Sequence, residues 1–352
     1  ATPRPGPFNR GPALGASLVR MLRRLALAGG VAATSYVALD ALVNDDLDEW
    51  TRPLSRRLSA SARAASGSRG ADAPPPERER VVVLGTGWAA ISFMRKLDPG
   101  QYDLTIVSPR PYFFYTPLLA SASTGTVSLR NVLEPVRAFT ARLADPRTRC
   151  EPRYVQASCE DVDPAGKVVH CRLSGGESLS LRYDHLVVAV GARASSYGTP
   201  GVETNAHFLQ EPAHAARLKA HLFGALERAS ALRLAGAPPR EVDRLLHVVV
   251  VGGGPTGVEL TAELSDLVRT DVARRFPEVA GRVRLTLVEQ LPRLLAGFHP
   301  DMSAYAADHL RGRGVDVRLG ARVVEVTPDG PVVQEQAGAR ARQPGAGAGQ
   351  PG

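Results

Sequence analysis

Apolar runs of strand length alternate with helix-like segments between residues 80 and 330. Val81–Leu84 and Val248–Val251 are runs of apolar, mostly β-branched residues, and each leads directly into glycine. After each glycine cluster, apolar residues recur every three or four positions, the spacing that gives a helix one apolar face. This alternation of strand and helix predicts an α/β fold with two doubly wound, Rossmann-like domains.

The first glycine cluster has the form of a dinucleotide-binding loop. Gly85, Gly87 and Ala90 make a G-x-G-x-x-A pattern between a strand and a helix. The first position permits a tight turn, the second lets the backbone approach a pyrophosphate, and the third allows close helix–strand packing. The acid expected after the next strand, Leu104–Val107, is absent, and Ser108-Pro109-Arg110 stands there. We therefore expect Ser108 to meet the ribose, unless that contact is made elsewhere.

The second glycine cluster repeats the pattern more completely. Gly252, Gly254 and Gly257 form G-x-G-x-x-G, and Pro255 stands where the first helical turn tolerates a missing N–H. The next strand, Val283–Val288, is followed by Glu289. A carboxylate at this position accepts hydrogen bonds from both ribose hydroxyls and repels a 2′-phosphate, so it predicts NADH in preference to NADPH.

Two such loops in one chain predict two nucleotides, one a flavin and one a nicotinamide dinucleotide. Hydride passes between them only when the two rings are stacked, so the task of the protein is to position them. The alternative for the first loop is a glycine turn that holds no ligand, and the alternative for Glu289 is a chance placement.

Composition divides the rest of the chain. Residues 1–50 contain an acid-free, arginine-containing stretch and the apolar run Leu25–Val43, which predict a presequence that is either cleaved or retained as a membrane anchor. Residues 51–79 have the composition of a linker. Residues 80–243 are expected to form the first part of the FAD-binding domain with a connecting helix, and residues 244–330 an incomplete NAD-binding domain. Residues 331–352 are poor in apolar side chains and predict a disordered low-complexity tail.

The net charge of +8 does not indicate nucleic-acid binding, because much of it lies at the ends of the chain. Five arginines and no acid lie in residues 1–39, and the folded body keeps only about +2. The three cysteines include no C-x-x-C pair. They are too few for a disulfide scaffold or a structural zinc site, so we interpret them as structural thiols and expect no metal site.

Several segments together resemble one enzyme family. The stretch Tyr112–Leu119 (YFFYTPLL), the strand end Tyr183–Ala192 (YDHLVVAVGA) and Gly252–Glu259 (GGGPTGVE) are similar to the type II, non-proton-pumping NADH:ubiquinone oxidoreductases. The similarity spans residues 80–330. It implies a flavoenzyme at the surface of the mitochondrial inner membrane that oxidises NADH with bound FAD and reduces ubiquinone, and it allows a homodimer.

The resemblance also implies roles for individual residues. Thr116, Pro117 and Leu118 would lie near the flavin ring, and Gly191 would approach it from the other side. Ser108 and Arg110 match the form seen in plant and fungal members. Glu259 would lie beside the nicotinamide as the candidate catalytic residue. The alternatives without a functional role are a solvated glutamate in a first helical turn at Glu259 and ordinary turn residues at Thr116, Pro117 and Gly191.

Members of this family continue well beyond the second loop, with elements that close both domains and build the quinone pocket. These elements are not found before residue 352. Two alternative functions therefore stay open. One is a soluble NADH-dependent flavoprotein reductase with another acceptor, and the other is an inactive relative that binds NADH.

Overall fold

A computed structural model describes residues 78–98, 100–144 and 152–335 of the chain. Nearly all of them belong to one compact unit, which excludes only residues 296–302. The predicted presequence, with the run Leu25–Val43, and nearly all of the linker lie outside the described residues. Within the described ranges, no helix is both long enough and apolar enough to cross a membrane.

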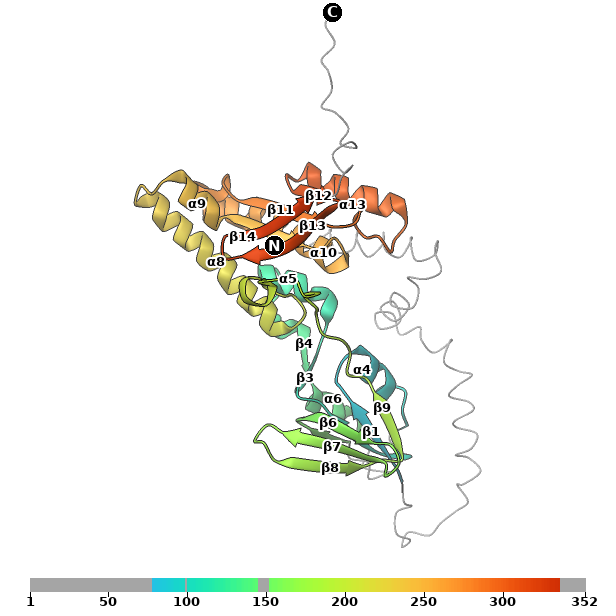
Figure 1. Cartoon of the computed structure of the whole chain (residues 1–352). Coiled ribbons are helices and arrows are strands. Elements are labelled where there is room, and N and C mark those ends of the chain that lie inside the picture. The colour runs from blue at the N-terminus through green and yellow to red at the C-terminus, as the bar shows by residue number, and fades with distance from the viewer. Residues whose placement is uncertain (1–77, 99, 145–151, 336–352) are drawn as a thin grey trace, which may run out of the picture. The chain divides into compact units, whose positions relative to one another are not determined.

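A parallel four-stranded sheet forms the first doubly wound segment (Figure 1). Its members are β1 (Glu79–Leu84), β2 (Tyr102–Val107), β5 (Arg153–Val155) and β9 (His185–Val188), in the order β5-β2-β1-β9. Numbered within the segment, this order is 3-2-1-4, the order of a dinucleotide-binding sheet. The first glycine loop leaves β1 at the carboxyl edge and begins α4 (Trp88–Met94).

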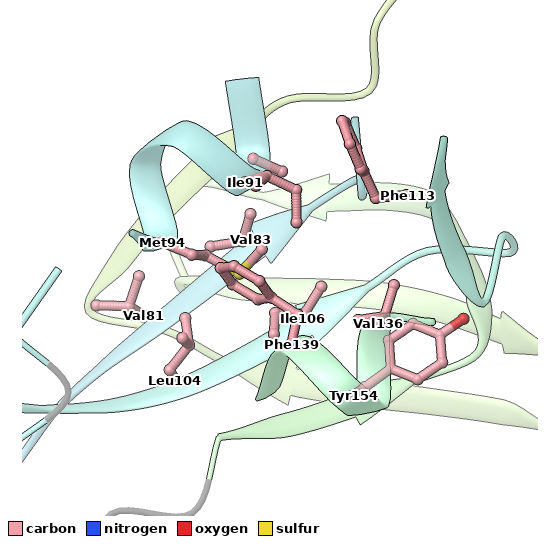
Figure 2. Packing of buried hydrophobic residues seen from close by; sticks show 11 residues of the cluster. Val81, Val83, Ile91, Met94, Leu104, Ile106, Phe113, Val136, Phe139 and Tyr154 are labelled. Carbon is pink, nitrogen blue, oxygen red and sulfur yellow. The ribbon is translucent and has the colours of Figure 1, made fainter. Parts of the chain in front are cut away.

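Both faces of this sheet are covered, which explains its nearly unbroken apolar strands. On one face Val83 and Ile106 pack with Met94 of α4 and Phe139 of α6 (Val136–Leu143) (Figure 2). On the other face Val82 and its neighbours pack with an antiparallel sheet. That sheet consists of β6 (Ala157–Asp163), β7 (Val168–Leu173) and β8 (Ser178–Arg182). A short pair, β3 (Tyr112–Phe114) and β4 (Leu133–Pro135), follows the first βαβ unit.

The second doubly wound segment has a parallel three-stranded sheet in the order β10-β11-β12. Its strands are β10 (His247–Val251), β11 (Arg284–Glu289) and β12 (Asp316–Leu319). The helices that follow the first two strands include α10 (Pro255–Leu267) and α13 (Pro300–Gly312). Between α10 and β11 lie η3, a π-helix (Val268–Val272), α11 (Ala273–Arg275) and α12 (Pro277–Ala280). The two parallel sheets confirm the predicted α/β fold class.

Helix α5 (Leu119–Thr124), which lies between β2 and β5 in sequence, and the helices that follow β9 pack against the second segment. The turn η1 (Thr116–Leu118) runs directly into α5, and Ala120 of α5 joins the core of β10, α10 and β11. The short elements η2 (Leu129–Val132) and α7 (Val202–Asn205) precede the long helix α8 (Pro212–Leu234). The apolar residues of α8 share a core with α9 (Pro239–Leu245), η3 and α12.

The predicted start of the disordered tail at residue 331 is wrong. An antiparallel hairpin joins β13 (Ala321–Thr327) to β14 (Gly330–Glu335), so the first five residues assigned to the tail form a strand. Gly330 takes a φ of +132° in the turn, and its carbonyl accepts a hydrogen bond from the Thr327 hydroxyl at 3.0 Å. The averaged composition of the tail concealed the apolar pair Val332-Val333 in this strand.

Candidate active site

The first glycine loop has the geometry that a pyrophosphate requires. Gly85 adopts a φ of +109°, and a Cβ atom there would lie 2.2 Å from the carbonyl oxygen of Ala189. Ala90 is fully buried against the sheet. At Gly87, by contrast, a Cβ would meet nothing within 4 Å. The outer positions are therefore filled by protein, and the middle one faces open space where a ligand can approach.

The second glycine loop is built similarly, except that a Cβ at its first glycine, Gly252, would meet nothing within 4 Å. Gly252 has a φ of +106°, and a Cβ at Gly257 would lie 1.9 Å from the Gly252 carbonyl oxygen. At Gly254 a Cβ would meet nothing within 4 Å. Gly254 also stands at the N-cap of α10, where the free N–H groups of the first turn favour an anion. Both loops thus present an uncrowded second glycine at a helix N-terminus.

Glu289 lies beside the second loop, but it also has a structural task. Its two carboxylate oxygens accept hydrogen bonds from the backbone N–H groups of Gly253 and Leu291, each at 2.6 Å. A Cβ at Gly253 would lie 3.0 Å from the Glu289 side chain, so this middle glycine allows the close approach. Each carboxylate oxygen has a second lone pair with which to accept a hydrogen bond from a ribose hydroxyl. Ribose contact by Glu289 stays a prediction.

The residues that replace the expected acid after β2 bind one another. Ser108 is buried, and its hydroxyl lies 3.2 Å from that of Thr86 and accepts the Arg110 N–H at 3.1 Å. The Arg110 guanidinium pairs with Glu211 at 2.8 Å and lies over the Phe114 ring. These contacts fix the loop beside Gly85, and a ribose contact by Ser108 stays a prediction.

Trp88 is a candidate site residue that the sequence analysis missed. Its indole N–H donates to the Thr116 hydroxyl at 2.9 Å, and its ring lies edge-on to Phe113 with centroids 5.0 Å apart. The ring of Tyr115 lies 5.3 Å away, and burial raises the pKa of that phenol. The first glycine loop is therefore joined directly to the Thr116–Leu118 turn, in which Pro117 is the second residue of the short helix.

Gly191 lies in an extended loop after β9 that is held by a single side chain. Its φ is +72°, and a Cβ there would meet nothing within 4 Å. Gln210 donates its side-chain amide to the carbonyl of Ala192 at 2.7 Å and accepts the N–H of Ala194 at 2.6 Å. The loop is thus fixed from one side while Gly191 faces open space.

Glu259 lies in the first turns of α10, one turn before Glu263. Its side chain keeps contact with solvent, yet crowding by surrounding protein and then the negative charge of Glu263 raise its pKa. In the described part of the chain, neither carboxylate forms an ion pair. Perturbed pKa values cluster at functional sites, so the raised pKa makes Glu259 a candidate functional residue.

Two surface hollows, of 370 and 260 Å³, lie beside α5 and α8 and share Lys219 and Phe223. Neither is lined by a predicted site residue. A cleft joining Thr116 and Glu259 stays a prediction.

The two described cysteines are free thiols. Cys159 of β6 and Cys171 of β7 lie opposite each other in the antiparallel register. Burial, aided by the nearby Cys159 and Glu160, raises the pKa of Cys171 to about 11. Such a thiol is protonated and unreactive at neutral pH, in line with a structural role. Cys150 lies outside the described residues.

Comparison with known proteins identifies the family. The model of the pyridine nucleotide-disulphide oxidoreductases matches residues 79–342. The chain belongs to this family. Its relatives include the external alternative NAD(P)H-ubiquinone oxidoreductase B2 of Arabidopsis thaliana, 41% identical over 256 residues, which cover 71% of this chain and 42% of the relative. The external NADH-ubiquinone oxidoreductase 2 of Saccharomyces cerevisiae is 40% identical, with 72% of this chain and 45% of the relative covered.

Solved structures agree with this assignment. NDH2 of Plasmodium falciparum, solved in complex with NADH, superposes with a TM-score of 0.69 and 30% identity, covering 74% of this chain and 51% of that one. The sulfide:quinone oxidoreductase of Aquifex aeolicus shares the fold at 22% identity and a TM-score of 0.55. The resemblance to type II NADH:ubiquinone oxidoreductases is confirmed at the level of relatives. The chain spans about half or less of the length of these proteins.

Proposed function

We propose that this chain forms the FAD-binding and NADH-binding parts of an enzyme that oxidises NADH and reduces ubiquinone without pumping protons. The proposal places the enzyme at the surface of the mitochondrial inner membrane. The names of the plant and yeast relatives support the substrates and the mitochondrial location. A homodimer is a further expectation from the family resemblance.

The observation that carries the proposal is the shared construction of the two glycine loops. In both, the first glycine has a φ above +100°, and the second faces open space at the start of a helix. The two loops share these features although they lie in separate βαβ units. The residues present therefore fit two nucleotide pyrophosphates, FAD at Gly87 and NADH at Gly254.

The remaining residues would orient what these loops bind. Bound FAD would accept a hydride from NADH and deliver the electrons to the quinone. Trp88 would hold the Thr116–Leu118 turn beside the first nucleotide through its 2.9 Å hydrogen bond. Glu259 would lie beside the second nucleotide, and its surroundings raise its pKa above that of a free glutamate. Glu289 would contribute the preference for NADH.

Absorbance of the purified chain tests the proposal. We expect a yellow protein whose flavin absorbance is bleached by NADH under anaerobic conditions and much less by NADPH. Adding a soluble ubiquinone analogue should restore the colour. Restoration by ferredoxin and not by the quinone would favour a reductase with another acceptor. A colourless protein that binds NADH would contradict turnover by this chain.

Two glycine variants separate the nucleotide sites. A Cβ at Gly87 or Gly254 meets no protein atom within 4 Å, so Gly87→Ala and Gly254→Ala should fold normally while the methyl obstructs a pyrophosphate. We expect Gly87→Ala to lose bound flavin. Gly254→Ala should stay yellow but bind NADH at least about tenfold more weakly, a difference of about 1.4 kcal/mol. Gly281→Ala is the matched control, because its Cβ is equally uncrowded and lies outside both loops. Equal losses in all three variants would contradict the assignment.

A further inference from the structure

Three hydroxyl groups gather around the carboxylate of Glu263. Ser121 donates to Oε1 at 2.8 Å, Thr126 donates to Oε2 at 3.0 Å, and the Thr124 hydroxyl lies 3.4 Å from Oε2. Ser121 and Thr124 are buried in α5, Thr126 follows that helix, and Glu263 belongs to α10. We call these four residues the hydroxyl clasp. It is a specific polar link between elements more than 130 residues apart in the sequence.

The clasp joins the two segments that carry the candidate flavin and nicotinamide contacts. The Thr116–Leu118 turn runs without a break into α5, so fixing Ser121 also fixes that turn. Glu259 lies one helical turn before Glu263 on α10, so fixing Glu263 fixes the start of α10. Apolar contact between Ala120 of α5 and Leu264 of α10 lies alongside the polar link.

We propose that Glu263 is a positioning residue, held by the hydroxyls of α5 so that Glu259 keeps a fixed position and electrostatic environment relative to the Thr116 turn. The proposal rests on the proposed function for the role of Glu259. The clasp itself rests only on the contacts above.

A charged residue at the centre of the clasp has an effect that a neutral tether would lack. Carboxylates four residues apart on a helix repel each other, so Glu263 favours the protonated form of Glu259. Crowding by the surrounding protein is the larger cause of the raised pKa of Glu259, and the charge of Glu263 is the second. The hydroxyl donors compensate the charge of Glu263 locally and hold it there.

A carboxyl titration tests the positioning role without requiring activity. The ¹³C chemical shift of the Glu259 carboxyl, assigned with Glu259→Gln, would be followed against pH in the full chain. Glu263→Gln keeps the shape but removes the charge, so the pKa of Glu259 should fall. Glu227→Gln, an exposed glutamate on α8, should leave it unchanged. An unchanged Glu259 titration in Glu263→Gln would overturn the proposal.

A double-mutant cycle tests the clasp itself. Ser121→Ala and Glu263→Gln should each lower the thermal midpoint, and together they should cost less than the sum, because both remove one interaction. Additive losses would overturn the clasp. Thr126→Val provides a second cycle from an exposed position, should Ser121→Ala unfold the chain.

NADH binding then separates the two proposals. Measured by fluorescence quenching, NADH affinity should fall about tenfold in Glu263→Gln, and no further when Ser121→Ala is added. Unchanged affinity in Glu263→Gln would overturn its positioning role. If the unmodified chain binds no NADH, the proposed function fails. The carboxyl titration and the double-mutant cycle then still test the hydroxyl clasp.

Discussion

At the scale of single residues, Glu289 supports the second loop, and we predict that it also sets nucleotide specificity. We expect Glu289→Gln to reduce the preference for NADH over NADPH about tenfold, because the charge that repels a 2′-phosphate is lost. Glutamine offers one acceptor oxygen in place of two, so either Gly253 or Leu291 would lose its acceptor. The variant should therefore unfold with about 1–3 kcal/mol less stability.

Dissociation constants for both nucleotides and urea unfolding of the same protein would measure these two effects. Glu227→Gln, remote from both loops, provides the control for loss of one carboxylate. An unchanged ratio of the two dissociation constants would mean that Glu289 serves the loop alone.

The residues found from the sequence are those whose signal is local. Gly85 and Gly87 are two positions apart, as are Gly252 and Gly254, so the spacing within each pair reveals the turn it builds. Trp88 and Thr116 are 28 positions apart, and Ser121 and Glu263 are 142 apart. No spacing rule connects such pairs. Ser121 also looks like any small helical residue until the fold brings a carboxylate to it.

At the scale of elements, α10 contains a destabilising feature at Glu259. The raised pKa of Glu259 means that the folded chain binds its proton more tightly than the unfolded chain does. Stability should therefore decrease as pH rises from the unfolded pKa through the folded one, and the cost is fully present above that window. Glu259→Gln should stabilise the chain at neutral pH and have little effect in acid.

Urea unfolding of both proteins at a series of pH values would test this. The difference between them should grow with pH across the acidic range and then level off. A difference that is constant with pH, or largest in acid, would show that the raised proton affinity has been misassigned.

Element types were predicted more reliably than element ends. The strand before each glycine loop and the helix after it follow from unbroken apolar runs and the helical spacing that succeeds them. The hairpin of β13 and β14 was missed because its second strand begins at a glycine and has only two apolar residues in sequence. Backbone pairing with β13 holds β14 in an extended form that the composition of β14 alone does not predict.

At the scale of the whole molecule, each parallel sheet has an edge strand, which is hydrogen-bonded to another strand on one side only. In the described chain, β9 and β10 are edge strands of their sheets. Val188 on β9 is 65% exposed and Val251 on β10 is 57% exposed. Apolar side chains on unpaired edge strands favour association between molecules. We expect the chain to associate increasingly with concentration and to bind a hydrophobic dye.

The double variant Val188→Thr, Val251→Thr should reduce both effects. Threonine keeps the β-branched shape that suits a strand, so the free energy of unfolding should change by no more than about 0.5 kcal/mol per site. Val332→Thr, on the 43% exposed valine of β14, is the matched control outside the parallel sheets. Sedimentation velocity at several concentrations would measure association. If the control reduced it as much as the double variant does, general surface polarity and not the edges of the parallel sheets would be its cause.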